Sequence, residues 1–151
     1  MQKMFVANKA LIVDLQGYVL LLQDSGTQED HEGGAGVWDI PGGRMDKEDK
    51  TLSDALVREL KEETGVDFDV SSAQILSASV WSISGDDDRR VTAIIYLLKV
   101  NKRPEIKLSN EHDDFGWFKP EEVDGKIPSP CLRQVLKVYK EQGSSLTTSS
   151  F

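Results

Sequence analysis

The chain has 151 residues, of which 38% are hydrophobic and 29% are charged, a composition typical of one globular domain. Its formal net charge of −8 argues against binding to nucleic acid or to an anionic membrane, because both need a basic face. No apolar run reaches the roughly 18 residues of a membrane span, and the N-terminus lacks the pattern of a signal peptide. A single cysteine, Cys131, excludes an internal disulfide and fits a cytoplasmic location.

The N-terminal third is predicted to contain three strands. Met4 to Asp14 and Tyr18 to Gln23 are rich in aliphatic residues and are separated by a turn at Gln16-Gly17. Asp24 to Gly36 is polar and rich in glycine, which predicts a mobile surface loop. A short strand, Val37 to Ile40, follows and ends at a proline.

Two glycines and an arginine come next, and each could contact a ligand. Gly42 and Gly43 carry no side chain, so the backbone there can come close to a ligand or to a helix. Arg44 could clamp a phosphate through its two-pronged guanidinium, or it could be an exposed loop arginine.

The following segment is predicted to be an amphipathic helix. Thr51 is a good N-terminal cap, and Gly65 stands where a left-handed C-terminal cap belongs. At about 100° per residue, Leu52, Leu56 and Leu60 fall near roughly 0°, 40° and 80° and form one apolar stripe.

Three glutamates lie beside or inside this stripe, on the side of the helix that should face the core. Glu59, Glu62 and Glu63 repel one another by roughly 0.2–0.5 kcal/mol for each close pair. They also meet the negative end of the helix dipole and lose hydration against an apolar face. A divalent cation would turn all three costs into stabilisation, and oxygen-only ligands favour Mg²⁺ or Mn²⁺. The alternative is a solvated acidic helix end.

The second half of the chain is predicted to add two long strands and a last helix. Ser72 to Ser84 and Val91 to Val100 are rich in strand-forming residues and are joined by a charged tip, Gly85 to Arg90. Trp81 and Tyr96 on these strands are candidates for lining a pocket.

The C-terminal part begins with a short helical turn at Lys119 to Val123, with a proline at its start. An amphipathic helix is predicted at Ser129 to Glu141. Residues 1–142 are therefore expected to form one domain, and the Ser/Thr-rich residues 143–151 a frayed tail.

The helix carries a motif that resembles a known family. Arg58 to Val66, R-E-L-K-E-E-T-G-V, fits R-E-U-x-E-E-x-G-U, the second half of the Nudix box, in which U is a bulky aliphatic residue. The preceding Pro-Gly-Gly, residues 41–43, is similar to the family's entry into the same loop and helix. The first glutamate of the full pattern would fall on Lys50; a one-residue insertion would restore Gly43 and let Glu48 or Asp49 supply the acid.

The resemblance implies a fold and a set of residue roles. The fold would be a Nudix-type α/β/α sandwich, in which a mixed β-sheet lies between helices. Glu59, Glu62 and Glu63 would hold the metal ion, and Arg58 would keep a neighbouring glutamate in place without touching substrate. Ser109 to Phe118 is similar to an acid-rich segment of many Nudix enzymes, so its Glu111 could be a further ligand, a base across the site, or an exposed loop acid.

The predicted function is that of a Mg²⁺-dependent pyrophosphohydrolase, which cleaves a nucleoside diphosphate linked to a second group. Metal ions would bridge the diphosphate and activate a water molecule, and a carboxylate would accept its proton. Glu63 or Glu62 is the first candidate for that base and Glu111 the next. A negatively charged protein with a negatively charged substrate needs such cations.

Two other functions remain open from the sequence. One is a catalytically silent Nudix-like domain that senses a nucleotide and regulates a partner. The other is a structural cation-binding domain, although the sequence lacks a calcium-loop pattern such as D-x-D-x-D-G. The resemblance does not fix the second group of the substrate, nor does it fix whether the chain forms a homodimer.

Overall fold

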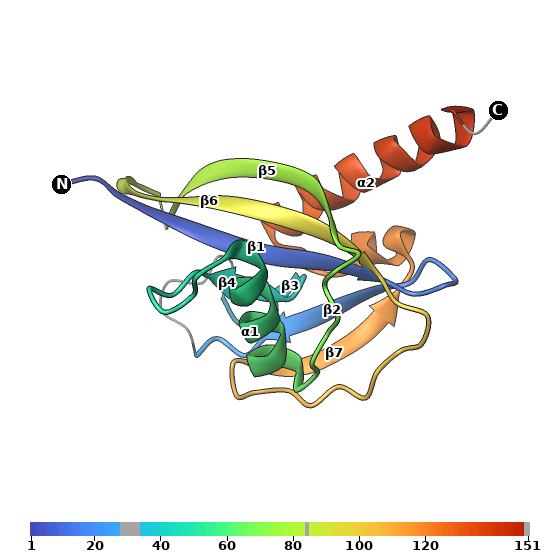
Figure 1. Cartoon of the computed structure of the whole chain (residues 1–151), viewed down its shortest axis with the longest axis horizontal. Coiled ribbons are helices and arrows are strands. Elements are labelled where there is room, and N and C mark those ends of the chain that lie inside the picture. The colour runs from blue at the N-terminus through green and yellow to red at the C-terminus, as the bar shows by residue number, and fades with distance from the viewer. Residues whose placement is uncertain (28–33, 84, 150–151) are drawn as a thin grey trace.

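The computed structural model describes residues 1–27, 34–83 and 85–149, and in the last helix it describes side chains up to residue 142. Its strands form one mixed sheet (Figure 1), made of β1 (Lys3–Val13), β2 (Val19–Asp24), β3 (Trp38–Asp39), β4 (Gly42–Arg44), β5 (Gln74–Ile83), β6 (Asp86–Lys99) and β7 (His112–Phe118). The helices are α1 (Leu52–Thr64), the 3-10 helix η1 (Pro120–Gly125) and α2 (Pro130–Ser149).

Strand β1 lies at the centre of the sheet, whose order is β3-β2-β1-β6-β5. It runs parallel to β6 over its whole length, from the pair Lys3↔Arg89 to the pair Val13↔Lys99. A parallel pair needs a long crossover, and here the crossover contains α1 and β5. Strand β4 pairs with β1 and β7 pairs with β2, both in antiparallel register.

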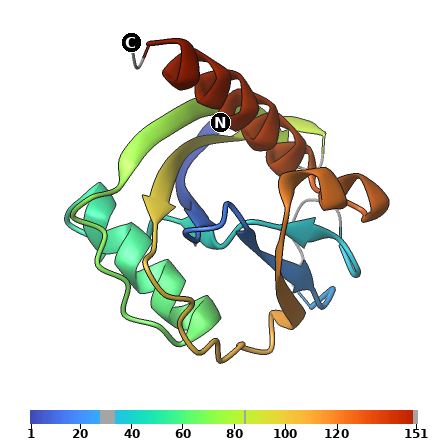
Figure 2. The same ribbon diagram turned by 90° about the vertical axis from the view of Figure 1, so that its right-hand side faces the viewer.

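The sheet is strongly curled, and α1 and α2 lie on opposite sides of it (Figure 2). Alternate residues of β1 serve the two sides, as the period of two in a strand requires. Leu11 and Val13 pack in one core with Leu132 and Val135 of α2. The neighbouring residues Ala10 and Ile12 pack in a second core with Leu56 and Leu60 of α1. The predicted mixed sheet between helices is confirmed.

Helix α1 begins and ends at the predicted caps. The side chain of Thr51 accepts a hydrogen bond from the Asp54 amide at 3.0 Å, and Gly65 adopts a left-handed φ of 74°. Leu56 and Leu60 are fully buried, as the stripe predicts. Leu52 is 38% exposed, however, because the first turn extends past the edge of the core, so the predicted stripe is one residue too long.

Three other features differ from the sequence prediction. The charged segment Asp86 to Arg90 belongs to strand β6 instead of forming a loop. Gly42 to Arg44 forms an additional strand, β4, against β1. Helix α2 continues to Ser149, beyond the predicted end at Glu141, because a single glycine costs a helix only about 1 kcal/mol and no proline follows it.

Residues 28–33 of the predicted surface loop lie outside the described part of the chain. The 3-10 helix η1, which starts at Pro120, confirms the predicted helical turn. Within the described residues, the structure contains no helix that is both long and apolar enough to cross a membrane.

Candidate active site

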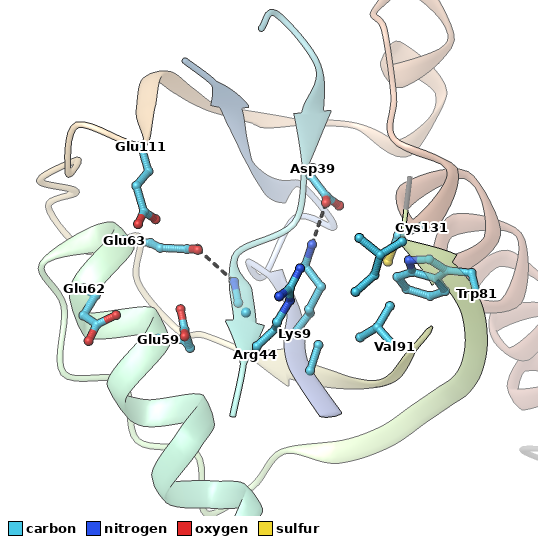
Figure 3. A pocket seen from close by; sticks show the side chains of 14 residues that line it. Lys9, Asp39, Arg44, Glu59, Glu62, Glu63, Trp81, Val91, Glu111 and Cys131 are labelled. Atoms are coloured by element: carbon cyan, nitrogen blue, oxygen red, sulfur yellow. Dashed lines mark hydrogen bonds and ion pairs between the residues drawn. The ribbon is translucent and has the colours of Figure 1, made fainter. Parts of the chain in front are cut away.

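A cavity of about 320 Å³ opens beside α1 and is lined by residues from both halves of the chain (Figure 3). Four carboxylates stand at one end of it, and they belong to Glu59, Glu62, Glu63 and Glu111. The first three come from α1, and Glu111 comes from the segment just before β7. The structure therefore brings together the four acids that the sequence analysis singled out.

Glu63 is the most deeply buried of these acids, with 4% of its surface exposed. Its Oε2 accepts a hydrogen bond from the Gly42 amide at 2.9 Å, which ties the helix to β4. Burial raises the pKa of Glu63 well above its ordinary value, and the Gly42 hydrogen bond and the Lys9 ammonium oppose this shift without cancelling it. In the absence of a cation, the site thus resists the ionisation of this carboxyl group.

Glu59 lies directly against the backbone of β4. A Cβ atom at Gly43 would come within 2.6 Å of Glu59 Oε2, so a side chain there would displace the carboxylate from its present position. Burial raises the pKa of Glu59 to about 7, although the Arg58 guanidinium opposes the shift, while Glu62 and Glu111 add to it. The predicted close approach of the Gly-Gly backbone is thus made to the helix.

Arg58 holds the acidic end of the helix to the preceding loop. Its Nε and Nη2 atoms donate to the two carboxylate oxygens of Asp49 at 2.9 and 2.8 Å. Nη1 also donates to Glu59 Oε1 at 3.1 Å and to Glu62 at 3.2 Å. The Arg58 hydrogen bonds are the main cause that lowers the pKa of Asp49.

Asp49 is therefore the acid that meets Arg58 among the three positions that the sequence left open. Its side chain is only 5% exposed, whereas Glu48 and Lys50 are exposed residues. An aspartate is one carbon shorter than the glutamate of the family pattern. A turn brings it within reach of Arg58: the Asp46 amide donates to Asp49 Oδ2 at 2.8 Å, and the Asp49 amide donates to the Asp46 carbonyl at 3.0 Å.

Glu62 and Glu111 differ in how they are held. The Glu62 side chain is 57% exposed, and both of its oxygens accept from Arg58. Glu111 is half-buried, and its position is fixed through its backbone, because its carbonyl accepts from the Ser25 amide at 3.0 Å. Glu63, Glu111 and His112 each offer one atom that could bind a metal ion, and these three atoms lie within 4.8 Å of one another. At this spacing the three residues could hold one ion together.

Arg44 lines the cavity next to the acidic end. Its guanidinium stacks on the Phe5 ring at 4.7 Å, and its carbonyl accepts from Arg58 Nη2 at 3.1 Å. The residue is half-buried, so it is not simply an exposed loop arginine. This placement leaves its positive charge facing the same space as the carboxylates (Figure 3).

The sequence analysis missed two charged residues that line the other end of the cavity, Lys9 and Asp39. Their signal was a lysine in the middle of the largely apolar run of β1 and an aspartate inside the short predicted strand Val37 to Ile40. Trp81 also lines the cavity, as the sequence allowed, whereas Tyr96 packs in the core beside α1. Cys131 is buried at the start of α2 and borders the same space.

A family model described as the NUDIX domain matches residues 5–137. The chain belongs to the Nudix family. This finding confirms the resemblance and the class of enzyme, a hydrolase of the Nudix type.

This Nudix chain is similar to two relatives in sequence and to a solved structure in fold. It is 31% identical over 117 residues to the CTP pyrophosphohydrolase of Escherichia coli (strain K12), covering 76% of each chain. It is 30% identical over 115 residues to the nucleoside triphosphatase NudI of the same strain, covering 68% of this chain and 76% of NudI. The MutT protein from Methanosarcina mazei Go1 superimposes with a TM-score of 0.78 at 23% identity, covering 94% of this chain and 96% of that one, which shows a shared fold.

Proposed function

We propose that this Nudix protein hydrolyses the diphosphate linkage of a nucleoside diphosphate derivative, with Mg²⁺ or Mn²⁺ as its metal. The observation that carries the proposal is the gathering of four carboxylates at one end of a single cavity, beside an arginine. The names of the two relatives, a CTP pyrophosphohydrolase and a nucleoside triphosphatase, agree with a nucleotide substrate.

The residues of the acidic end fit a hard divalent cation. Glu59, Glu62 and Glu63 offer only oxygen atoms, which Mg²⁺ and Mn²⁺ prefer. Without a cation, the pKa values of Glu59 and Glu63 are raised, because burial and mutual repulsion disfavour their charged forms. A cation held by these three glutamates would neutralise the oxygens of the diphosphate and lower the pKa of a water molecule.

The remaining residues have roles that follow from their contacts. Glu111 is the proposed proton acceptor, because among the described residues nothing donates a hydrogen bond to its carboxylate, whereas the other three acids are already hydrogen-bonded. Arg44 is proposed to bind a phosphate oxygen, and the bare backbone of Gly43 lets the substrate come close. Arg58 is a positioning residue, since it contacts Glu59 and Glu62 but does not line the cavity.

The test is a panel of nucleoside triphosphates, nucleotide sugars, dinucleoside polyphosphates and ADP-ribose, each incubated with the protein and Mg²⁺. We expect the release of phosphate, pyrophosphate or a nucleoside monophosphate from at least one class, and its loss when EDTA removes the metal. Glu111→Gln should reduce the rate by about 10²–10⁴-fold, the usual contribution of a general base. Glu105→Gln, at an exposed acid outside the cavity, is the matched control.

The alternative of a silent nucleotide-sensing domain makes the opposite prediction. Nucleotide binding would then be retained with no turnover across the whole panel, at any Mg²⁺ or Mn²⁺ concentration. The assembly of all four acids around the cavity does not favour it, because a sensor has no need of a carboxylate positioned to accept a proton.

A further inference from the structure

A second group of possible metal ligands lies next to the three glutamates of α1, and one of its members is a histidine. The ligand atoms of Glu63, Glu111 and His112 all lie within 4.8 Å of one another. Two ligands of a tetrahedral zinc ion stand about 3.4 Å apart, because each bond is about 2.1 Å long. The three atoms therefore need to approach one another by at most about 1.4 Å, which side-chain rotation can supply.

This group is buried, unlike a cluster of acids on a surface. Glu63 is 4% exposed, His112 is 8% exposed, and Glu111 is half-buried. The Glu111 carboxylate points toward the Glu63 side chain (Figure 3). Burial is the main cause of the raised pKa of Glu63, and repulsion from Glu59 and Glu111 adds to it. A cation between the two facing carboxylates would compensate both costs.

The three ligands are held by two different parts of the fold. Glu63 Oε2 accepts from the Gly42 amide at 2.9 Å, which leaves Oε1 for a cation. The Glu111 carbonyl accepts from the Ser25 amide at 3.0 Å. His112 is the first residue of β7, which pairs with β2. An ion bound by all three residues would therefore connect α1 to the β2–β7 pair.

The nitrogen ligand distinguishes this group from the glutamates of α1. Mg²⁺ prefers oxygen ligands, whereas an imidazole suits Zn²⁺ and other transition metal ions. One nitrogen and two carboxylate oxygens, with a fourth position left for water, is a donor set of the kind that zinc sites use. Glu63 and Glu111 line the cavity and His112 does not, so the imidazole would reach the ion from within the protein.

We propose that Glu63, Glu111 and His112 form a site for a transition metal ion, with Zn²⁺ as the ion that fits its donor set, and that an ion bound there inhibits hydrolysis. The inhibition rests on the proposed function, in which Glu63 holds Mg²⁺ and Glu111 accepts a proton. A zinc ion bound to both carboxylates takes a ligand away from Mg²⁺. It also occupies the oxygen of Glu111 that would accept the proton, because a metal ligand must stay deprotonated.

The first experiment measures the binding of Zn²⁺ and of Mg²⁺ by calorimetry, on the full chain without nucleotide. In His112→Asn we expect the affinity for Zn²⁺ to fall by about 100-fold or more, because one of three protein ligands is lost. The affinity for Mg²⁺ should change by less than about threefold, since Mg²⁺ prefers oxygen. His31→Asn, at the other histidine of the sequence, is the matched control and should keep the wild-type affinity for Zn²⁺. Equal Zn²⁺ affinity in the wild type and His112→Asn would overturn the assignment.

Diffraction from wild-type crystals soaked in Zn²⁺ tests the site without a substitution, so it decides even if His112→Asn does not fold. Anomalous scattering at the zinc edge should place an ion about 2.0–2.2 Å from the imidazole and from one oxygen of each carboxylate. Zinc bound only between Glu59 and Glu62, or only at Cys131, would contradict the inference.

Inhibition is measured by adding Zn²⁺ at saturating Mg²⁺, with a nucleotide that the wild type cleaves. Each protein is compared with its own rate without zinc. The Zn²⁺ concentration that halves the rate should be about 100-fold or more higher for His112→Asn than for the wild type, in line with the lost affinity. His31→Asn should be inhibited like the wild type. Zinc bound at the site without any loss of rate would refute the inhibitory role.

The zinc site and the proposed function can fail separately. If no nucleotide is hydrolysed but Zn²⁺ binds through His112, the proposed function and the inhibition fail, and the metal site stands. If nucleotides are hydrolysed but the Zn²⁺ affinity does not depend on His112, the zinc site fails and the hydrolase stands.

Discussion

Glu63 lies where helix α1, strand β4 and the segment that carries Glu111 and His112 come together. It belongs to α1, it accepts the Gly42 amide of β4, and one of its carboxylate oxygens lies within reach of Glu111 and His112. A carboxylate so buried is costly when it is charged and alone. Its environment therefore makes sense when a cation is present to compensate the charge.

Replacing this carboxylate by an amide tests that interpretation. Glu63→Gln keeps an oxygen that can accept the Gly42 amide, but it removes the charge that would hold the metal. We expect turnover to fall by orders of magnitude, while the metal-free protein melts at the same temperature or higher, since repulsion with Glu59 is relieved. Thermal melting and the rate of the nucleotide assay check the two halves. A variant that melts much earlier yet keeps its rate would contradict the assignment.

Arg58 should act on metal affinity through the acids that it orients. Arg58→Lys cannot reproduce the two parallel hydrogen bonds to Asp49 together with the contacts to Glu59 and Glu62. We expect the affinity for Mn²⁺, measured from the signal of free Mn²⁺ in electron paramagnetic resonance, to fall by about 10–100-fold. Arg133→Lys, at an exposed position of α2, is the control. Unchanged Mn²⁺ affinity in Arg58→Lys would show that the arginine only supports the loop.

The residues that the sequence could and could not reveal differ in where their partners lie. Glu59, Glu62 and Glu63 share one helix, so helical spacing alone groups them. Lys9 and Asp39 are 30 positions apart in the sequence and lie on β1 and β3, which β2 separates in the strand order. They meet because the sheet is strongly curled. No local sequence pattern predicts a contact between residues so far apart. The only indication was the desolvation cost of a lysine among apolar neighbours.

Helix α1 is held by its buried apolar face, while its acids face the cavity. Leu56 is 1% exposed and Leu52 is 38% exposed, although both were predicted to lie on the same stripe. Leu56→Ala should therefore lower the free energy of unfolding by about 2–5 kcal/mol. The same change at Leu52 should cost only about 0.5 kcal/mol, as at other surface positions. Urea denaturation of the two variants measures the difference, and equal losses would show that the first turn is packed as tightly as the second.

The elements themselves were predictable where their signals are local. The caps at Thr51 and Gly65 fixed α1, and runs of aliphatic residues located the long strands. Strand β4 was missed because Gly42 to Arg44 has no strand propensity of its own. Its pairing depends on Gly42, where a Cβ would lie 2.3 Å from the Asn8 carbonyl oxygen, so only glycine allows β4 to lie against β1.

The acids behind the net charge of −8 include two groups whose pKa values are shifted in opposite directions. Burial raises the pKa values of the buried acids at the cavity, so these acids resist ionisation. Asp14 and Asp49 lie elsewhere and are paired with Arg103 and Arg58. Burial opposes ionisation there too, but the hydrogen bonds from these arginines lower both pKa values. The two groups therefore act in different pH ranges. The ion-paired aspartates contribute stability that is lost only as the pH falls below their ordinary value of 3.8.

The cavity acids act at higher pH and with the opposite sign. The pKa of Glu59 is raised from 4.5 to about 7, and that of Glu63 is also raised. Below pH 4.5 these groups are protonated in both the folded and the unfolded chain, and their contribution to stability is complete. Between pH 4.5 and about 7 the unfolded chain ionises first, so the metal-free protein should lose stability as the pH rises through this range.

Under the proposed function, Mg²⁺ should reverse this trend, because a cation held by the ionised carboxylates would stabilise only the folded state. We therefore expect the melting temperature of the metal-free protein to fall between pH 5 and pH 8, and saturating Mg²⁺ to raise it much more at pH 8 than at pH 5. The double variant Glu59→Gln/Glu63→Gln should flatten the metal-free slope and lose the response to Mg²⁺ at both pH values. Calorimetric melting at the two pH values, with and without Mg²⁺, measures all of these quantities. An equal rise on adding Mg²⁺ at pH 5 and pH 8 would mean that the metal does not bind the buried glutamates, since proton competition at those two groups is what makes the response depend on pH.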